Sequence, residues 1–160
     1  MVSQEVFRAE CYRCHKPVLT CICARLPLVN NRTEVIVLQH PRERLHPIGT
    51  ARFARLGLAR STVHVAWNAG AAESEPPEWL EPGTGLLYPS PHAQLLETLP
   101  SEARPERLLV LDGTWHTAKT LYRDKHWLHQ LPHYRLAPEQ PGRYRLRREP
   151  RHDYVSTIEA

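Results

Sequence analysis

Blocks of apolar residues alternate along the chain with polar, proline-rich connections. Apolar runs of strand length occur at 33–39, 62–67, 85–91, 108–111 and 133–136, and the third run ends in a proline turn. The stretches between them include 40–47, 68–82 and 138–142, whose composition predicts loops.

Residues of helical period lie between several of these strands. The pattern predicts helices over 48–58, over 91–99 with Ser90 as cap, and from Thr114 or Trp115 to about Gln130. Because strands and helices alternate, we expect an α/β fold with a mostly parallel sheet and flanking helices.

The stretch 108–119 is a strand, a tight turn and a helix start in immediate succession. Four apolar residues end at Asp112, and Gly113 and Thr114 follow before the helical pattern begins. In open α/β sheets, ligands bind beyond the carboxyl ends of the strands, which is where Asp112 would lie. The alternative is that Asp112 or Thr114 only caps the helix. The spacing alone leaves both interpretations open.

The four cysteines all lie within 13 residues, as Cys11-x2-Cys14 and Cys21-x-Cys23. Two close pairs joined by a short loop can supply four thiolates to one tetrahedral zinc ion. Such a closed shell would be structural, because it leaves no open position for chemistry. Unrelated buried thiols, or a redox Cys-x-x-Cys that would need a βαβ context, are the alternatives.

Length and composition limit the remaining possibilities. The 160 residues suit one domain with an appendage, which we expect at 1–30 as the zinc element, followed by an α/β domain at 31–160. No apolar run approaches the ~18 residues of a membrane span. The N-terminus lacks the apolar core of a signal peptide, so we expect a cytoplasmic protein without membrane contact.

The charge of the chain is weak evidence for binding to nucleic acid. The formal net charge is +4, from 21 basic and 17 acidic residues, and five arginines fall within 143–152. The arginines that we expect to contact RNA phosphates are Arg52, Arg55, Arg143, Arg145 and Arg148. A solvated helix face or strand edge would show the same pattern.

Five spaced elements resemble, in the same order, the motifs of the DTW-domain family, the tRNA-uridine aminocarboxypropyltransferases. They are the C-x2-C-x2-P-x3-C-x-C pattern closing at Leu26-Pro27, then Thr50 and Arg52, Leu-Tyr-Pro-Ser at 87–90, Asp-x-Thr-Trp at 112–115, and Tyr-x-Leu-Arg to Ser-Thr-x-Glu-Ala at 144–160. Gly49 and Ala51 depart from the second motif. In the family a helix follows the last motif, so we expect this chain to lack a C-terminal helix.

The resemblance implies a SPOUT-like fold, with a possible C-terminal knot that holds S-adenosylmethionine. It further implies transfer of the 3-amino-3-carboxypropyl group of S-adenosylmethionine to N3 of a tRNA uridine, with release of methylthioadenosine. Asp112 would either assist removal of the N3 proton or hold the ammonium group of the donor. Which uridine is modified, and the oligomeric state, are left open.

The resemblance also assigns the residues of the site. The catalytic candidates are Asp112, Thr114 and Trp115, and the residues expected to bind S-adenosylmethionine are Leu87, Tyr88, Pro89, Ser90, Asp112, Gly113, Leu146, Arg147, Ser156 and Thr157. The alternatives are a methyltransferase that uses the same pocket and a non-catalytic, zinc-containing RNA-binding module.

Overall fold

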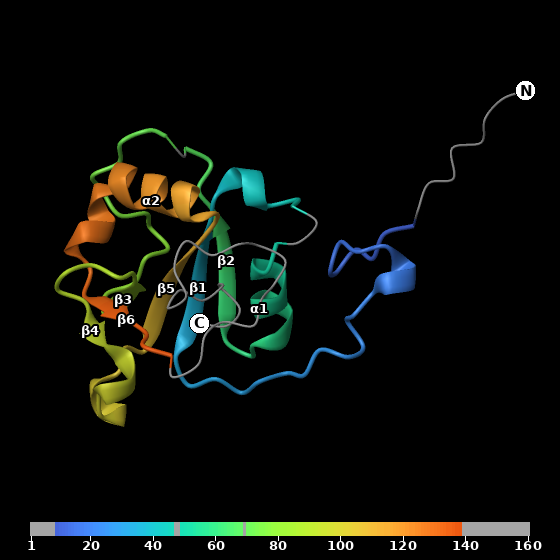
Figure 1. Cartoon of the computed structure of the whole chain (residues 1–160), viewed down its shortest axis with the longest axis horizontal. Coiled ribbons are helices and arrows are strands. Elements are labelled where there is room, and N and C mark those ends of the chain that lie inside the picture. The colour runs from blue at the N-terminus through green and yellow to red at the C-terminus, as the bar shows by residue number, and fades with distance from the viewer. Residues whose placement is uncertain (1–8, 47–48, 69, 139–160) are drawn as a thin grey trace, which may run out of the picture.

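A six-stranded sheet forms the centre of the protein. The computed structural model describes residues 9–46, 49–68 and 70–138 (Figure 1). The strands are β1 (Glu34–Gln39), β2 (Ser61–Val65), β3 (Thr84–Leu87), β4 (Gln94–Leu95), β5 (Arg107–Asp112) and β6 (His133–Arg135). Their order is β2-β1-β5-β3-β6-β4, and every pair among these strands is parallel. The expected α/β fold with a mostly parallel sheet is confirmed.

Two α-helices make crossovers in opposite directions. Helix α1 (Ala51–Gly57) connects β1 to its neighbour β2, and α2 (Trp115–Asp124) leads from β5 past β3 to β6. Because such crossovers are right-handed, the two helices lie on opposite faces of the sheet. The adjacent strands β1 and β5 therefore border the point at which the winding reverses.

The main core lies between the sheet and α2. Ile36 and Leu38 of β1 and Leu109 and Leu111 of β5 alternate onto this face. They pack with Ala118 and Leu121 of α2 and with Trp127 and Leu128. Leu121 and Leu128 are fully buried, so truncation of either to alanine costs about 2–5 kcal/mol. This packing fixes α2, and with it the turn that precedes the helix.

The predicted helix up to Gln130 is interrupted at Lys125. Helix α2 ends at Asp124, and a separate 3-10 helix, η5 (His126–Gln130), follows. The Lys125 ammonium is almost completely buried, 2.7 Å from Glu73 Oε1 and 3.0 Å from the Asn68 carbonyl. Glu73 N–H also donates to the Asp124 carbonyl, and His126 N–H donates to that of Glu73. The connection 68–82, expected to be exposed, is thus anchored here, and its Trp79 and Leu80 also pack against the main core.

The helix predicted over 91–99 is wrong. This stretch contains the short strand β4 and the 3-10 helix η3 (Leu96–Thr98). Gln94 and Leu95 pair with Tyr134 and Arg135 of β6, so an edge position in the sheet overrides the helical pattern. Ser90, expected to cap this helix, instead contacts a histidine described below.

Short 3-10 helices complete the described part. They are η1 (Val18–Thr20), η2 (Pro41–Glu43) and η4 (Ser101–Ala103). Among the residues described, no helix is both long and apolar enough to cross a bilayer. The expected C-terminal knot lies outside the described residues.

Candidate cofactor and substrate site

Gln39 and Asp112 face each other at the carboxyl ends of β1 and β5. They are paired in register, and Gln39 Nε2 donates a hydrogen bond of 2.9 Å to Asp112 Oδ2. Both side chains are buried, and the His40 N–H donates to the Asp112 carbonyl. Since β1 and β5 border the reversal of winding, this pair lies where open α/β sheets form their ligand crevice.

The turn after Asp112 contains the residue that caps α2. Thr114 is the N-cap, and its Oγ1 accepts the Thr117 N–H. Asp112 is the last residue of β5, two residues before this cap. A Cβ at Gly113 would lie 2.3 Å from Thr117 Oγ1, so a larger residue at this turn would require the Thr117 side chain to move. Trp115, the first residue of α2, is half-buried.

The segment 87–90 leaves the sheet beside this turn. Leu87 pairs with Val110, two residues before Asp112, so Tyr88, Pro89 and Ser90 continue along the end of β5. The Tyr88 ring stacks on Tyr122 of α2, with the ring centres 4.0 Å apart. The structure therefore brings together two of the segments predicted to bind the cofactor, 87–90 and 112–115.

Sequence reasoning missed His133, which fixes the hydroxyl of Ser90. The His133 Nδ1 lies 2.7 Å from Ser90 Oγ, and its Nε2 lies 3.1 Å from the Leu128 carbonyl. A carbonyl only accepts, so Nε2 carries a proton, and in the neutral form of the ring Nδ1 then accepts the Ser90 O–H. The lone pairs of Ser90 Oγ can then accept hydrogen bonds from other groups. The two residues are 43 positions apart, and no sequence pattern links them.

The four cysteines converge on one point. Their sulfur atoms lie within 4.8 Å of one another, with Cys11 to Cys23 and Cys14 to Cys21 at 3.8 Å. A tetrahedron with Zn–S bonds of ~2.3 Å has edges of ~3.8 Å. All four are free thiols rather than disulfides. The predicted cluster is therefore present, and its donor set and size fit zinc.

Backbone donors and burial act on these thiols in opposite directions. Backbone N–H groups of Cys14 and Arg13 lower the pKa of Cys11 to about 6. Burial and the neighbouring thiols raise the pKa of Cys23 to about 12. A negative charge on Cys11 therefore opposes the ionisation of Cys23, until a cation compensates that charge.

Helix α1 anchors the cysteine cluster to the α/β domain. Arg52 is buried and donates to the carbonyls of Cys14, at 2.9 Å, and His46, at 2.7 Å. The exposed Arg55 donates to the Arg13 carbonyl at 3.2 Å. Figure 1 shows the N-terminal element beside α1. Arg52, expected to contact RNA phosphates, is thus engaged inside the protein, whereas most of Arg55 is exposed to solvent.

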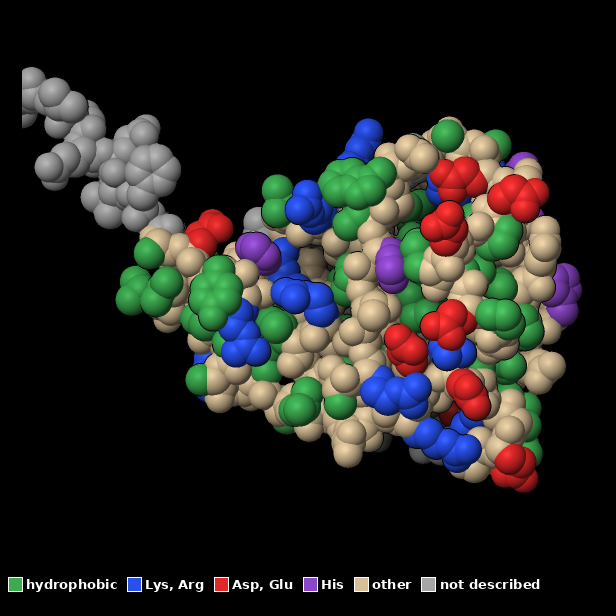
Figure 2. Space-filling view, turned by 180° about the vertical axis from the view of Figure 1, so that it is seen from behind, with side chains coloured by type: hydrophobic (Ala, Val, Ile, Leu, Met, Phe, Trp, Pro, Cys, Tyr) green, Lys and Arg blue, Asp and Glu red, His purple; other side chains and the backbone are tan. Residues whose placement is uncertain are grey.

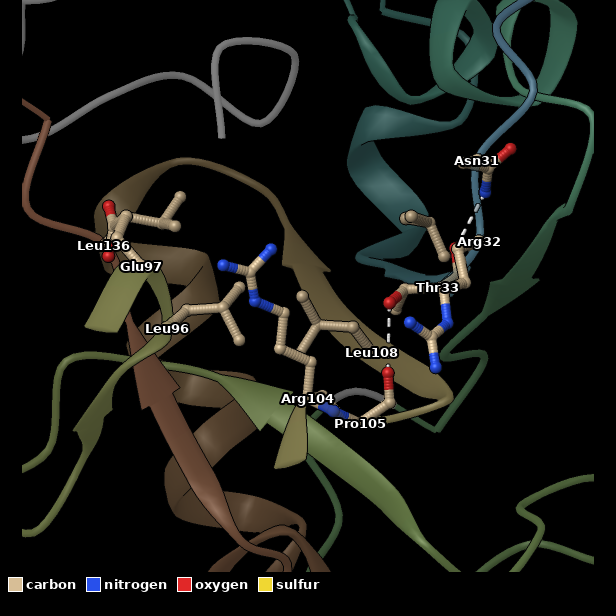
Figure 3. A pocket seen from close by; sticks show the side chains of 10 residues that line it. Asn31, Arg32, Thr33, Leu96, Glu97, Arg104, Pro105, Leu108 and Leu136 are labelled. Carbon is tan, nitrogen blue, oxygen red and sulfur yellow. Dashed lines mark hydrogen bonds between the residues drawn. The ribbon is translucent and has the colours of Figure 1, made fainter. Parts of the chain in front are cut away.

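A cavity of about 460 Å³ opens at the other end of the strands (Figure 3). Val35 and Leu108, near the starts of β1 and β5, line it together with Leu96 and Leu136. Of its charged residues, Glu97 accepts the Ala137 N–H and Arg104 donates to the Leu99 carbonyl. The cavity lies away from Asp112 and shares none of the predicted site residues.

Part of the predicted site lies outside the described residues. This applies to the expected cofactor ligands Leu146, Arg147, Ser156 and Thr157 and to the expected RNA contacts Arg143, Arg145 and Arg148. The described part of the site consists of the turn after β5, the segment after β3, and Gln39.

The comparison with known families agrees with this arrangement. A sequence model for the DTW domain matches residues 8–160, which include the cysteine cluster and the Asp112 turn. The chain belongs to the DTW domain family. No solved structure gives a significant match to this DTW chain.

Curated relatives of this DTW chain carry transferase names. Two proteins named tRNA-uridine aminocarboxypropyltransferase 2 match 95% of the chain, at 31% identity in Drosophila melanogaster and 30% in Mus musculus. Arabidopsis thaliana tRNA-uridine aminocarboxypropyltransferase A is 29% identical over 72% of the chain. The chain spans only 63%, 54% and 51% of the lengths of these three relatives, respectively.

Proposed function

We propose that the chain transfers the 3-amino-3-carboxypropyl group of S-adenosylmethionine to N3 of a uridine in tRNA. Methylthioadenosine would be the second product. The names of the relatives and the match to the DTW domain support this assignment. The structural observation that carries it is the buried Gln39–Asp112 pair at the reversal of winding between β1 and β5.

Bound S-adenosylmethionine supplies an electrophilic carbon next to its sulfonium, so the protein's task is alignment and proton removal. Asp112 is the residue to which we assign the central role. The amide N–H from Gln39 stabilises its ionised form, and an anionic carboxylate suits a site for the donor's ammonium group. A carboxylate at this position is compatible with both roles, binding of the ammonium group and removal of the N3 proton.

The neighbouring segments would complete the donor site. Thr114 caps α2, so backbone N–H groups at this helix start can donate hydrogen bonds to the carboxylate of S-adenosylmethionine. Leu87, Tyr88 and Pro89 would form a wall, and Ser90, whose proton is directed to His133, would accept a hydrogen bond from the donor. Trp115 is half-buried beside the turn and could stack on a base. Together they would turn the propyl carbon, rather than the methyl group, towards the uridine.

The four cysteines would hold a structural zinc ion. The 3.8 Å sulfur separations and the all-thiolate donor set support this metal. Such a site would contribute to folding of the N-terminal element at 1–30 rather than to the transfer step. Arg52 and Arg55 would then join that element to the catalytic domain at 31–160.

RNA contacts are proposed on exposed arginines. Arg55 is available in the described part, and Arg143, Arg145 and Arg148 remain expectations from the sequence. The uridine must leave its stack before N3 becomes accessible, so the target is expected in a loop or as an extruded base. The cytoplasmic location also stays a prediction.

Nucleoside mass spectrometry tests this proposal. An unmodified tRNA transcript is incubated with the chain and S-adenosylmethionine, digested and analysed. The expected result is a uridine that carries the aminocarboxypropyl group. A methylated nucleoside would identify a methyltransferase instead, and unchanged RNA together with undetectable donor binding by calorimetry would support the non-catalytic RNA-binding module.

A further inference from the structure

Trp67 is a large aromatic side chain that the fold leaves in solvent. Its exposed fraction is 66%, although it lies only two residues after Val65, the last residue of β2. The guanidinium of Arg44, from the connection between β1 and α1, lies 5.2 Å from the centre of the Trp67 ring. Arg44 is itself exposed and takes part in none of the ion pairs found among the described residues. Neither residue is used by the proposed donor site.

Backbone contacts connect this pair to the proposed catalytic residue. The Ala66 N–H, one residue before Trp67, donates to the Gln39 carbonyl, and the Gln39 side chain donates to Asp112. Strands β2, β1 and β5 are consecutive in the sheet, so Trp67 follows a strand end two strand spacings, or about 10 Å, from that of Asp112. Trp67 and Arg44 therefore lie at the edge of the sheet that carries the site.

We propose that Trp67 and Arg44 form a stacking platform for a nucleotide that flanks the target uridine. The identity of the RNA rests on the proposed function. When a uridine is extruded, its neighbouring base loses one stacking partner, and an exposed indole can replace that partner. Arg44 presents its positive charge to the adjacent phosphate, and Arg42 in the same connection is also exposed.

The distribution of charge favours RNA as the partner. On the face shown in Figure 2, most acidic side chains lie on the half away from the four-cysteine element, and the charged side chains of the other half are mainly Lys and Arg. In the segment 40–46 the only acidic residue, Glu43, is buried, whereas Arg42 and Arg44 are exposed. A polyanion with an open base face matches both the charge and the aromatic surface. An apolar protein partner would be complementary to the Trp67 ring but not to the charge of Arg42 and Arg44.

The test is RNA binding by the whole chain in the absence of S-adenosylmethionine. Unmodified tRNA transcript is titrated into the wild type, Trp67→Ala, Trp67→Phe and Arg44→Ala, at several salt concentrations. Two controls are Leu45→Ala, an exposed apolar residue of the same connection, and Arg104→Ala, an exposed cation at the other end of the sheet. Because the substituted side chains are exposed, melting temperatures should stay close to that of the wild type.

Trp67→Ala should weaken binding about five-fold or more, since stacking on an aromatic side chain contributes this much per base. Trp67→Phe should retain most of the affinity, because it keeps a ring. Arg44→Ala should weaken binding and reduce the salt slope by about one. The two controls should bind like the wild type.

Equal binding by Trp67→Ala and the wild type would overturn the platform and leave the proposed transfer untouched. The same holds if Trp67→Ala changes only self-association, measured by sedimentation, because the surface would then be a protein interface. Loss of binding in Trp67→Ala combined with absence of transfer by the wild type would support the platform and contradict the enzyme. A wild-type chain that binds no RNA would overturn both.

Discussion

Gln39 Nε2 and Asp112 Oδ2 lie 2.9 Å apart, although 73 positions separate the two residues in the chain. The contact exists because β1 and β5 are parallel neighbours that end in register. A buried carboxylate is thereby held by an amide donor at the end of the sheet where ligands bind. The proposed chemistry depends on this pair.

Asp112→Asn should abolish most of the transfer while leaving the fold intact. Asparagine still offers an oxygen to Gln39 Nε2, so the hydrogen bond survives and the negative charge is lost. We expect a loss of activity of about 100-fold or more, with a change in the free energy of unfolding below about 1 kcal/mol.

The kinetics of Asp112→Asn distinguish its two possible roles. If Asp112 holds the donor's ammonium group, KM for S-adenosylmethionine rises; if it removes the N3 proton, kcat falls and its dependence on pH changes. Gln39→Met serves as the matched variant, because it removes the hydrogen-bond donor to Asp112 and keeps the negative charge of Asp112. Transfer by Asp112→Asn at the wild-type rate would rule out both roles.

The protein should contain about one equivalent of zinc when it is purified without chelator. Cys11→Ser and Cys14→Ser should each lose the metal, because serine does not replace a thiolate ligand. Zinc release should increase as the pH falls, since protons compete for the thiolates. Elemental analysis and a colorimetric chelator measure these quantities, and iron or absence of metal would refute the assignment.

Arg52→Met should destabilise the attachment of the cysteine element. The substitution leaves the carbonyls of Cys14 and His46 without this hydrogen-bond donor. Each carbonyl that stays buried should lower the free energy of unfolding by about 1–3 kcal/mol. Arg55→Met is the control, because Arg55 is exposed and its loss should cost less than about 0.5 kcal/mol. Urea unfolding and the rate of zinc release report the difference. Equal effects of the two variants would mean that Arg52 does not anchor the element.

The Lys125–Glu73 pair should respond asymmetrically to substitution. Glu73→Ala leaves the Lys125 ammonium buried without its carboxylate and should cost about 3–5 kcal/mol. Lys125→Ala leaves a partly exposed Glu73 that water can solvate, so its cost should be smaller. Urea unfolding of both variants at pH 7 makes the comparison. A larger loss for Lys125→Ala would contradict this interpretation.

The same pair sets a dependence on pH. Its interaction with Lys125 lowers the pKa of Glu73 below the ordinary value of 4.5. The pair therefore stabilises the fold fully above pH 4.5, and this contribution is lost as the pH falls through the lowered pKa. The acid-induced loss of stability should be smaller in Glu73→Ala than in the wild type.

The sequence predicted five of the six described strands, β4 being the exception, and the signal was strongest for β1 and β5, whose residues are mostly buried. It also predicted Asp112 at a strand end and the cysteine cluster, because those signals are local. The helix over 91–99 failed because β4 pairs with β6, some 40 residues away. Gln39 and His133 were missed, and Arg52 was expected to contact RNA phosphates, because their partners come from distant segments of the chain.

The most direct measurement identifies the nucleoside that S-adenosylmethionine leaves behind when it reacts with tRNA in the presence of the protein. The wild-type chain should release methylthioadenosine in an amount equal to the modified uridine, and Asp112→Asn should release almost none. Release of adenosylhomocysteine instead, or equal release of methylthioadenosine by Asp112→Asn, would contradict aminocarboxypropyl transfer at the Gln39–Asp112 site.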